Sequence, residues 1–146
     1  MAASRLTVIL LVFVLMGPLL GALVFGLATT LWLAVAEAEL ALMILPATLM
    51  FFPLSYLIGG FQALVAGIAA AVAAWRTGRL VWWPPLCVAL AAGIVYMSRS
   101  HEDVAMSAIL LASHVGAAAG CLLILRQMFG RETPAPRGGN LPADAG

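Results

Sequence analysis

Long runs of apolar residues that contain no charge constrain this chain more than any other feature. Of its 146 residues, 64% are hydrophobic and only 9% are charged, a composition far outside the range of soluble domains. A helix needs about 20 apolar residues to cross a bilayer, and a chain in lipid has to satisfy its backbone hydrogen bonds internally. The sequence therefore predicts an all-α protein that crosses a membrane several times.

Four runs in this chain are long enough to cross a bilayer once. They lie at about residues 6–32, 54–75, 80–97 and 106–125. Because helices that span lipid also pack against one another, we expect these four crossings to form one bundle. The sequence thus predicts a polytopic protein with a single four-helix transmembrane domain over residues 1–126.

The second run belongs to a longer uncharged stretch that a single crossing does not explain. Residues 40–75 contain no charged side chain, and as one straight helix they would be about 54 Å long. Pro46 and Pro53 interrupt this stretch, so we interpret residues 40–52 as a kinked extension or as an interfacial segment on the membrane surface. A fifth crossing over residues 31–52 is the alternative.

The arginines distinguish between four and five crossings, because Lys and Arg tend to stay on the cytoplasmic side. With four crossings and a cytoplasmic N-terminus, six of the seven arginines are cytoplasmic and only Arg99 is outside. Five crossings would instead export Arg76, Arg79 and the three C-terminal arginines. The absence of lysine and the abundance of alanine are typical of a GC-rich bacterial genome. We therefore predict a multi-pass protein of the bacterial inner membrane, with the N-terminus and the C-terminus in the cytoplasm.

The C-terminal segment differs from the rest of the chain in composition. Residues 127–146 are polar and rich in Pro and Gly, so they cannot bury a core and are expected to form a disordered cytoplasmic tail. The net charge of the whole chain is only +1. Such a chain has no basic field with which to hold nucleic acid, and we expect no nucleic-acid partner.

Small residues recur at four-residue intervals in the predicted helices. Such small-xxx-small patterns let two helix backbones approach closely in lipid. They indicate either an ordinary compact bundle or a face for dimerisation. The helix-packing residues predicted in this way are Gly17, Gly21, Gly59, Ala63, Gly67, Ala112, Gly116 and Gly120.

An ionisable residue, His114, lies inside the fourth predicted crossing, in the stretch ILLASHVGAAAGCLLIL. Gln62 lies in the second crossing, and each of the two is 8 residues into its helix. At 1.5 Å per residue, both side chains are about 12 Å below the same surface. We therefore predict that Gln62 and His114 form an intramembrane polar pair, in which a hydrogen bond satisfies groups that are costly to leave bare in lipid.

The same two residues also permit a functional interpretation. Ionisable groups inside a membrane often mark ion or proton paths, and a neutral imidazole can ligate haem iron or a metal. One alternative is therefore a small oligomeric transporter or channel that uses His114 and Gln62. Another is a haem or cofactor carrier, for which a second copy of the chain would have to supply the second histidine.

No group of residues in the sequence indicates a reaction site. The outer loop contains His101, Glu102 and Asp103, but the zinc-binding spacing HExxH fails because Ala105 stands where the second histidine is needed. The sequence offers no nucleophile with a partner base, no phosphate-binding glycine loop and no paired carboxylates. We expect no enzyme, with no catalytic, cofactor-binding or metal-binding residues. We expect instead an accessory or oligomerising component whose partners are the lipid bilayer and a second copy or another membrane protein.

Two stretches of the chain resemble known sequences. SYLIGGFQALVAG, which contains Tyr56, Gly59, Ala63 and Gly67, and RTGRLVWWPP at the next turn are similar to segments of small four-helix inner-membrane proteins of proteobacteria. The function of those proteins is unassigned. The resemblance covers about a third of the chain and implies a four-helix membrane fold without implying an activity.

Overall fold

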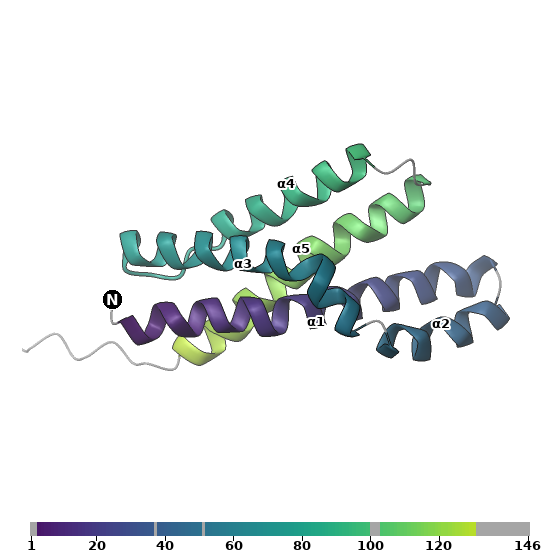
Figure 1. Cartoon of the computed structure of the whole chain (residues 1–146), viewed down its shortest axis with the longest axis horizontal. Coiled ribbons are helices and arrows are strands. Elements are labelled where there is room, and N and C mark those ends of the chain that lie inside the picture. The colour runs from purple at the N-terminus through teal and green to yellow at the C-terminus, as the bar shows by residue number, and fades with distance from the viewer. Residues whose placement is uncertain (1–2, 37, 51, 100–102, 131–146) are drawn as a thin grey trace, which may run out of the picture.

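The computed structural model of the chain describes residues 3–36, 38–50, 52–99 and 103–130. These residues form five α-helices joined by short turns, and no strand occurs among them, so the predicted all-α class is confirmed. The helices are α1 (Ala3–Ala36), α2 (Ala38–Met50), α3 (Phe52–Thr77), α4 (Trp83–Arg99) and α5 (Val104–Phe129) (Figure 1).

The longest helix, α1, is the element against which most of the molecule packs. It has 34 residues and is therefore about 51 Å long, and it contacts α2, α3 and α5. It continues through Pro18, whose missing N–H leaves one carbonyl of the preceding turn without its usual donor. Close to that point, the Tyr56 hydroxyl donates a hydrogen bond of 2.6 Å to the carbonyl of Leu15. This bond ties the start of α3 to the middle of α1.

The segment predicted as a kinked extension or interfacial piece, residues 40–52, is largely a separate helix. α2 turns back and runs antiparallel along the last part of α1 (Figure 1). Pro46 lies inside α2, whereas Pro53 is the second residue of α3, in the first helical turn, where a missing N–H costs little. The chain thus changes direction next to Pro53 and not at Pro46.

A left-handed residue, Gly78, ends α3 and starts the turn to α4. Its φ is +70°, and its N–H donates to the Ala74 carbonyl at 2.9 Å, as is common where glycine stops a helix. α4 begins at Trp83, three residues after the predicted start of that crossing at residue 80. Pro84 and Pro85 follow directly in the first turn of α4, where proline is favoured.

Helices α1, α3, α4 and α5 are packed tightly at one end of the molecule and spread apart at the other. We call these the closed end, where α1 begins, α3 turns into α4 and α5 finishes, and the open end, where the α4–α5 pair diverges from α1 and α2 (Figure 1). The core lies toward the closed end. The most deeply buried apolar side chains there are Ile9, Phe13, Ala70, Ala74, Cys121, Leu122 and Leu125.

Three helices in the described part of the chain are long and apolar enough to cross a membrane. These segments are Ala3–Val35, Gly59–Thr77 and Val104–Phe129. α4 has 17 residues and runs alongside α3 and α5. α5 extends to Phe129, beyond the predicted end of the fourth crossing at residue 125, and residues 131–146 of the predicted tail lie outside the described residues.

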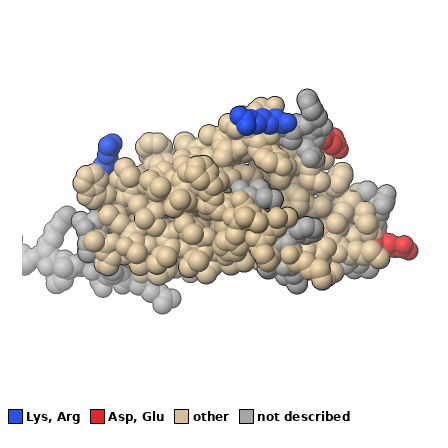
Figure 2. All heavy atoms as spheres, in the orientation of Figure 1, with Lys and Arg blue, Asp and Glu red and all other residues tan. Residues whose placement is uncertain are grey.

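The outer surface of the helices is apolar over most of its area. Large hydrophobic side chains that would be buried in a water-soluble bundle are exposed, among them Leu57 at 80%, Phe61 at 78% and Trp83 at 67%. In Figure 2, on the face in view, blue side chains lie at the closed end and at the tip of the α4–α5 pair, and red ones lie at that same tip and at the tip of the α1–α2 hairpin. An apolar belt between two charged ends is the surface expected of a protein whose middle lies in lipid.

Candidate functional site

A cavity of about 410 Å³ lies between α1, α3, α4 and α5, on the open-end side of the core. We call it the central cavity. It forms where the helices diverge. Its lining residues lie between positions 13 and 25 of α1, 54 and 66 of α3, 89 and 96 of α4, and 110 and 118 of α5. Tyr96 and Leu54 line it and are 44% and 42% exposed, so the cavity is not sealed from the surroundings of the protein.

Small residues on several helices provide the space. Gly17, Gly21, Ala63 and Ala117 all lie on the wall and project little or nothing into the cavity. Gly59 lies there too, and a Cβ atom added to it would meet no atom within 4 Å. At Gly59, the cavity volume therefore depends directly on the absence of a side chain.

His114 supplies the principal polar group of the wall. Its Nδ1 atom lies 2.7 Å from the carbonyl oxygen of Leu110. Because a carbonyl can only accept, Nδ1 has to carry the proton and donate it, and in the neutral ring Nε2 is then an acceptor with a free lone pair. Ser113 donates from its hydroxyl to the same carbonyl at 2.7 Å and lies 3.3 Å from Nδ1. These contacts fix the ring with one acceptor nitrogen unused by its own helix.

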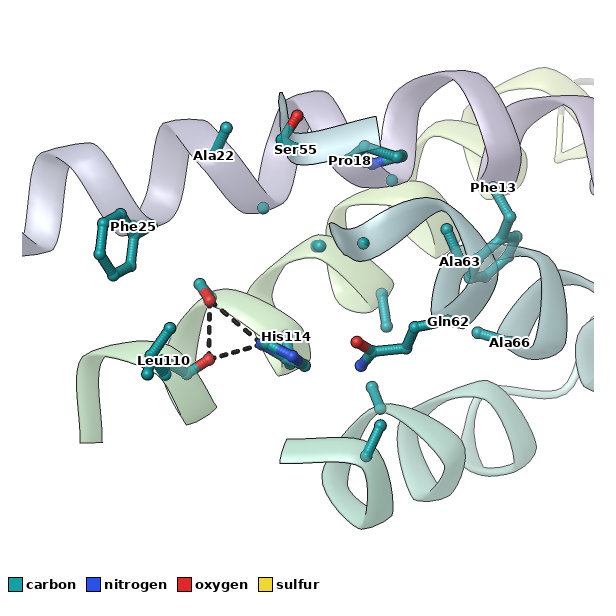
Figure 3. A pocket seen from close by; sticks show the side chains of 18 of the residues that line it. Phe13, Pro18, Ala22, Phe25, Ser55, Gln62, Ala63, Ala66, Leu110 and His114 are labelled. Carbon is teal, nitrogen blue, oxygen red and sulfur yellow. Dashed lines mark hydrogen bonds between the residues drawn. The ribbon is translucent and has the colours of Figure 1, made fainter. Parts of the chain in front are cut away.

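Gln62 faces His114 across the central cavity. It lies ten residues after the first residue of α3, and His114 lies ten residues after the first residue of α5; both line the central cavity. Figure 3 shows the Gln62 amide pointing into the cavity toward the imidazole. The structure shows no hydrogen bond between the two side chains, however: His114 Nδ1 is paired with the Leu110 carbonyl, and Nε2 remains open to the cavity. The cavity separates the members of the predicted pair.

The remainder of the wall is mainly apolar. Phe13, Pro18 and Phe25 from α1 line it together with Leu54 of α3. The Tyr96 ring of α4 lies 6.5 Å from the His114 ring, measured between centroids. An apolar cavity with a few convergent polar groups is the usual form of a small-molecule site. It suits a largely apolar molecule that carries a hydrogen-bonding group.

Sequence reasoning did not identify Tyr96 or Ser113 as parts of this site. The sequence could have indicated Ser113. A serine three residues after Leu110 can donate to the Leu110 carbonyl within the same helix, which is the carbonyl that also holds His114. Tyr96 carries no such signal. Its place on the wall depends on how α4 packs against α5, which the residue pattern does not specify.

The predicted helix-packing residues occupy different surroundings. An added Cβ at Gly17 would lie 3.0 Å from Ala63 Cβ, at Gly67 2.9 Å from Phe13 Cβ and at Gly120 2.9 Å from Leu20 Cδ1. Gly116 and Gly21 are also close to a neighbouring helix, at 3.3 Å from Val24 and 3.7 Å from Ala117. Ala112 is exposed, and Gly59 faces the central cavity.

The acidic and histidine-containing outer loop is only partly described. His101 and Glu102, like Glu37, lie outside the described residues, whereas Asp103 precedes α5 and is exposed. Among the residues that the structure does describe, no group of three His, Cys, Asp or Glu side chains is placed to hold a metal ion.

Comparison of the chain with protein-family models, with curated proteins and with solved structures finds no match.

Proposed function

We propose that this chain is a non-enzymatic integral protein of a bacterial inner membrane in which α1, α3, α4 and α5 are the four crossings. Three of these have the length and composition of a membrane span. The fourth, α4, has 17 residues and would cover about 25 Å, most of a hydrocarbon core of about 30 Å. The apolar surface between the two charged ends supports this placement.

The distribution of charge supports an orientation with the closed end in the cytoplasm. Of the described charged residues, four arginines belong to the closed end, and one arginine and two acids belong to the open end. The former are Arg5, Arg76, Arg79 and Arg126, and the latter are Arg99, Glu39 and Asp103. Arginine remains preferentially on the cytoplasmic side, so the N-terminus and the end of α5 would both be cytoplasmic.

Within this placement, we propose that the protein binds a small amphiphilic molecule in the central cavity. The observation that carries this proposal is that one largely apolar cavity presents both Gln62 and His114. A hydroxyl group of a guest could donate to His114 Nε2 and accept from the Gln62 amide, while an alkyl chain would contact the Phe13, Pro18 and Phe25 side chains. The protein would act as an accessory component that holds such a molecule for a membrane system.

The hairpin of α1 and α2 supports an accessory or oligomerising role. It carries exposed apolar side chains, with Val35 91%, Met43 70% and Met50 84% exposed. A contiguous apolar surface of this kind is covered either by lipid or by another protein. A second copy of the chain or another membrane protein is the partner that we propose.

A transporter or channel that uses His114 and Gln62 is the second candidate. The position of both residues on the wall of one cavity favours it. A continuous path would also have to pass the closed end, where Phe13, Leu122 and Leu125 are 1%, 0% and 0% exposed. Because that core is tightly filled, the arrangement of the helices supports binding better than passage.

Filling the central cavity tests the binding proposal. The probe is a long-chain alcohol that carries a photoreactive group and an alkyne tag, applied to the purified full chain in detergent. We expect labelling of peptides that line the cavity, and we expect Gly59→Leu to remove most of it, because the leucine side chain would occupy the open space at that position. Peptide mass spectrometry after tagging gives the measurement.

The neighbouring residue provides a matched control. Gly60 also has open space at its Cβ position but does not line the central cavity, so Gly60→Leu adds the same bulk to the same helix and should leave the labelling intact. Equal labelling of both variants, or labels confined to outward-facing residues, would show that the probe only dissolves in the detergent around the helices.

A further inference from the structure

The walls of the central cavity are of two chemical kinds, which alternate around it. α1 and α4 each pack against both α3 and α5, so α1 and α4 form one pair of opposite walls and α3 and α5 form the other. The first pair contributes the aromatic rings of Phe13, Phe25 and Tyr96. The second pair contributes Gln62 and His114, whose side chains face one another in Figure 3. The cavity therefore offers aromatic surface in one direction and hydrogen-bonding groups in the other.

His114 determines which polar groups of a guest can bind. Its Nδ1 is paired with the Leu110 carbonyl at 2.7 Å, so in the neutral ring the Nε2 atom that is open to the cavity can only accept a hydrogen bond. An ether or ketone oxygen of a guest also only accepts, and against Nε2 it would leave two lone pairs facing each other without a proton. Gln62 makes no such selection, because an amide both donates and accepts. His114 thus selects a guest that carries a free donor group.

The aromatic walls favour a ring as the body of the guest. Aromatic rings attract one another by more than the area they bury accounts for, and a rigid ring loses less conformational freedom on binding than an alkyl chain does. The Tyr96 ring lies 6.5 Å from the His114 ring, measured between centroids, so aromatic surface lies beside the acceptor nitrogen. Because Leu54 and Tyr96 on the wall are partly exposed, a chain attached to the ring of a guest need not be enclosed.

We propose, building on the binding of an amphiphilic molecule proposed above, that the guest of the central cavity is a phenol whose hydroxyl donates to His114 Nε2. A hydroxyl carried directly by an aromatic ring combines the two features that the walls select, and Gln62 can donate to the same oxygen. The hydroquinone form of a lipid quinone belongs to this class. The oxidised form does not, since both of its oxygens only accept.

Competition of matched ligands with the photoreactive alcohol tests this proposal on the purified full chain in detergent. The competitors are nonylphenol, its methyl ether and nonylcyclohexanol, each with the chain opposite the oxygen. We expect nonylphenol to displace the photoprobe from the cavity peptides at about a tenfold lower concentration than its methyl ether, because the ether cannot donate to Nε2. Nonylcyclohexanol keeps the hydroxyl but lacks the aromatic ring, and it should also require a higher concentration than nonylphenol.

His114→Phe is the matched variant. It keeps an aromatic ring at this position but removes the acceptor nitrogen, so nonylphenol should lose its advantage over the methyl ether, while the methyl ether should compete as it does in the wild-type chain. The two ligands partition into detergent in the same way with either protein, so partitioning cannot produce this change. Competition by the methyl ether also shows that the variant is folded around its cavity, and the comparison of the three ligands on the wild-type chain does not depend on the variant.

The possible results have different meanings. Preferential displacement by nonylphenol that depends on His114 supports the proposal. Equal displacement by nonylphenol and its methyl ether, or by nonylphenol and nonylcyclohexanol, would overturn it, as would a preference that persists in His114→Phe. Photolabelling that Gly59→Leu removes but that no competitor displaces would overturn the phenol and leave the binding of an amphiphile intact. Photolabelling that is insensitive to Gly59→Leu would instead contradict the central-cavity proposal itself.

Discussion

The histidine and glutamine of the central cavity show what residue positions along a helix can and cannot specify. The depth of each residue follows from the constant rise of the helix, and the sequence places Gln62 and His114 at equal depth. Their separation across the bundle depends on the angle between the helices, which counting residues does not give. The Leu110 carbonyl was always within reach of His114 because it is four residues earlier on the same helix. This local partner occupies Nδ1, and Nε2 is left for a group from across the cavity.

The adjacent threonines of α1 allow a prediction about buried hydroxyl groups. Thr29 is 6% exposed, and its Oγ1 has no hydrogen-bond partner among the described residues. A buried hydroxyl without a partner costs about 1 to 3 kcal/mol. Replacing it with a methyl group of the same shape, as Thr29→Val does, should therefore raise the free energy of unfolding by about 1 kcal/mol. Thermal unfolding of the purified protein in detergent, followed by circular dichroism, measures the change.

The neighbouring Thr30 is the natural comparison. Its hydroxyl donates to the Gly26 carbonyl at 2.7 Å, so Thr30→Val removes a hydrogen bond and should not stabilise the protein. A lower unfolding temperature for Thr29→Val than for Thr30→Val would mean that the Thr29 hydroxyl is satisfied, contrary to the structure.

Among the helices, those that follow unbroken apolar runs were predictable and the arrangement of the long second run was not. α1 and α5 coincide closely with the first and fourth predicted crossings. An apolar run of this length between charged residues forms a single helix in lipid. Residues 40–75 contain no charge and little polar periodicity, so only proline marked a break. Proline is favoured in first turns and is also tolerated inside helices in lipid, where neighbouring groups satisfy the freed carbonyl, so the sequence could not tell Pro46 inside α2 from Pro53 at the start of α3.

The contact between α1 and α3 leads to a prediction about two glycines of the same helix. A Cβ at Gly67 would lie 2.9 Å from the Cβ of Phe13, and Phe13 is only 1% exposed, so the two helices would have to separate. We expect Gly67→Ala to lose about 1 to 3 kcal/mol through overpacking. Gly60→Ala has open space and should gain about 1 kcal/mol from helix propensity.

Unfolding in a denaturant series compares the two alanine variants directly. The opposite signs separate helix packing from helix propensity, since both substitutions change α3 in the same chemical way. If Gly67→Ala were as stable as Gly60→Ala, the close approach of α1 and α3 would be wrong.

For the whole molecule, the packing of the helices and the distribution of charge support the same orientation in a membrane. The closed end combines the filled core and four of the described arginines, and the open end combines the diverging helices and the described acids. The number of crossings decides whether these ends face opposite sides of a membrane as proposed. With five crossings, the turn between α3 and α4 would be exported, because an extra crossing reverses every later loop.

Introduced cysteines at the two ends test this orientation in intact cells. Cys87 is first replaced by alanine because it is exposed, while Cys121 is buried and can remain. Thr77→Cys marks the closed end, and Asp103→Cys marks the open end without loss of a cap, because the Asp103 side chain makes no capping hydrogen bond. With arginines held in the cytoplasm, a membrane-impermeant maleimide should label the cysteine at position 103 in intact cells and the one at position 77 only after permeabilisation. The reverse pattern would place the four closed-end arginines outside the cytoplasm and overturn the proposed orientation.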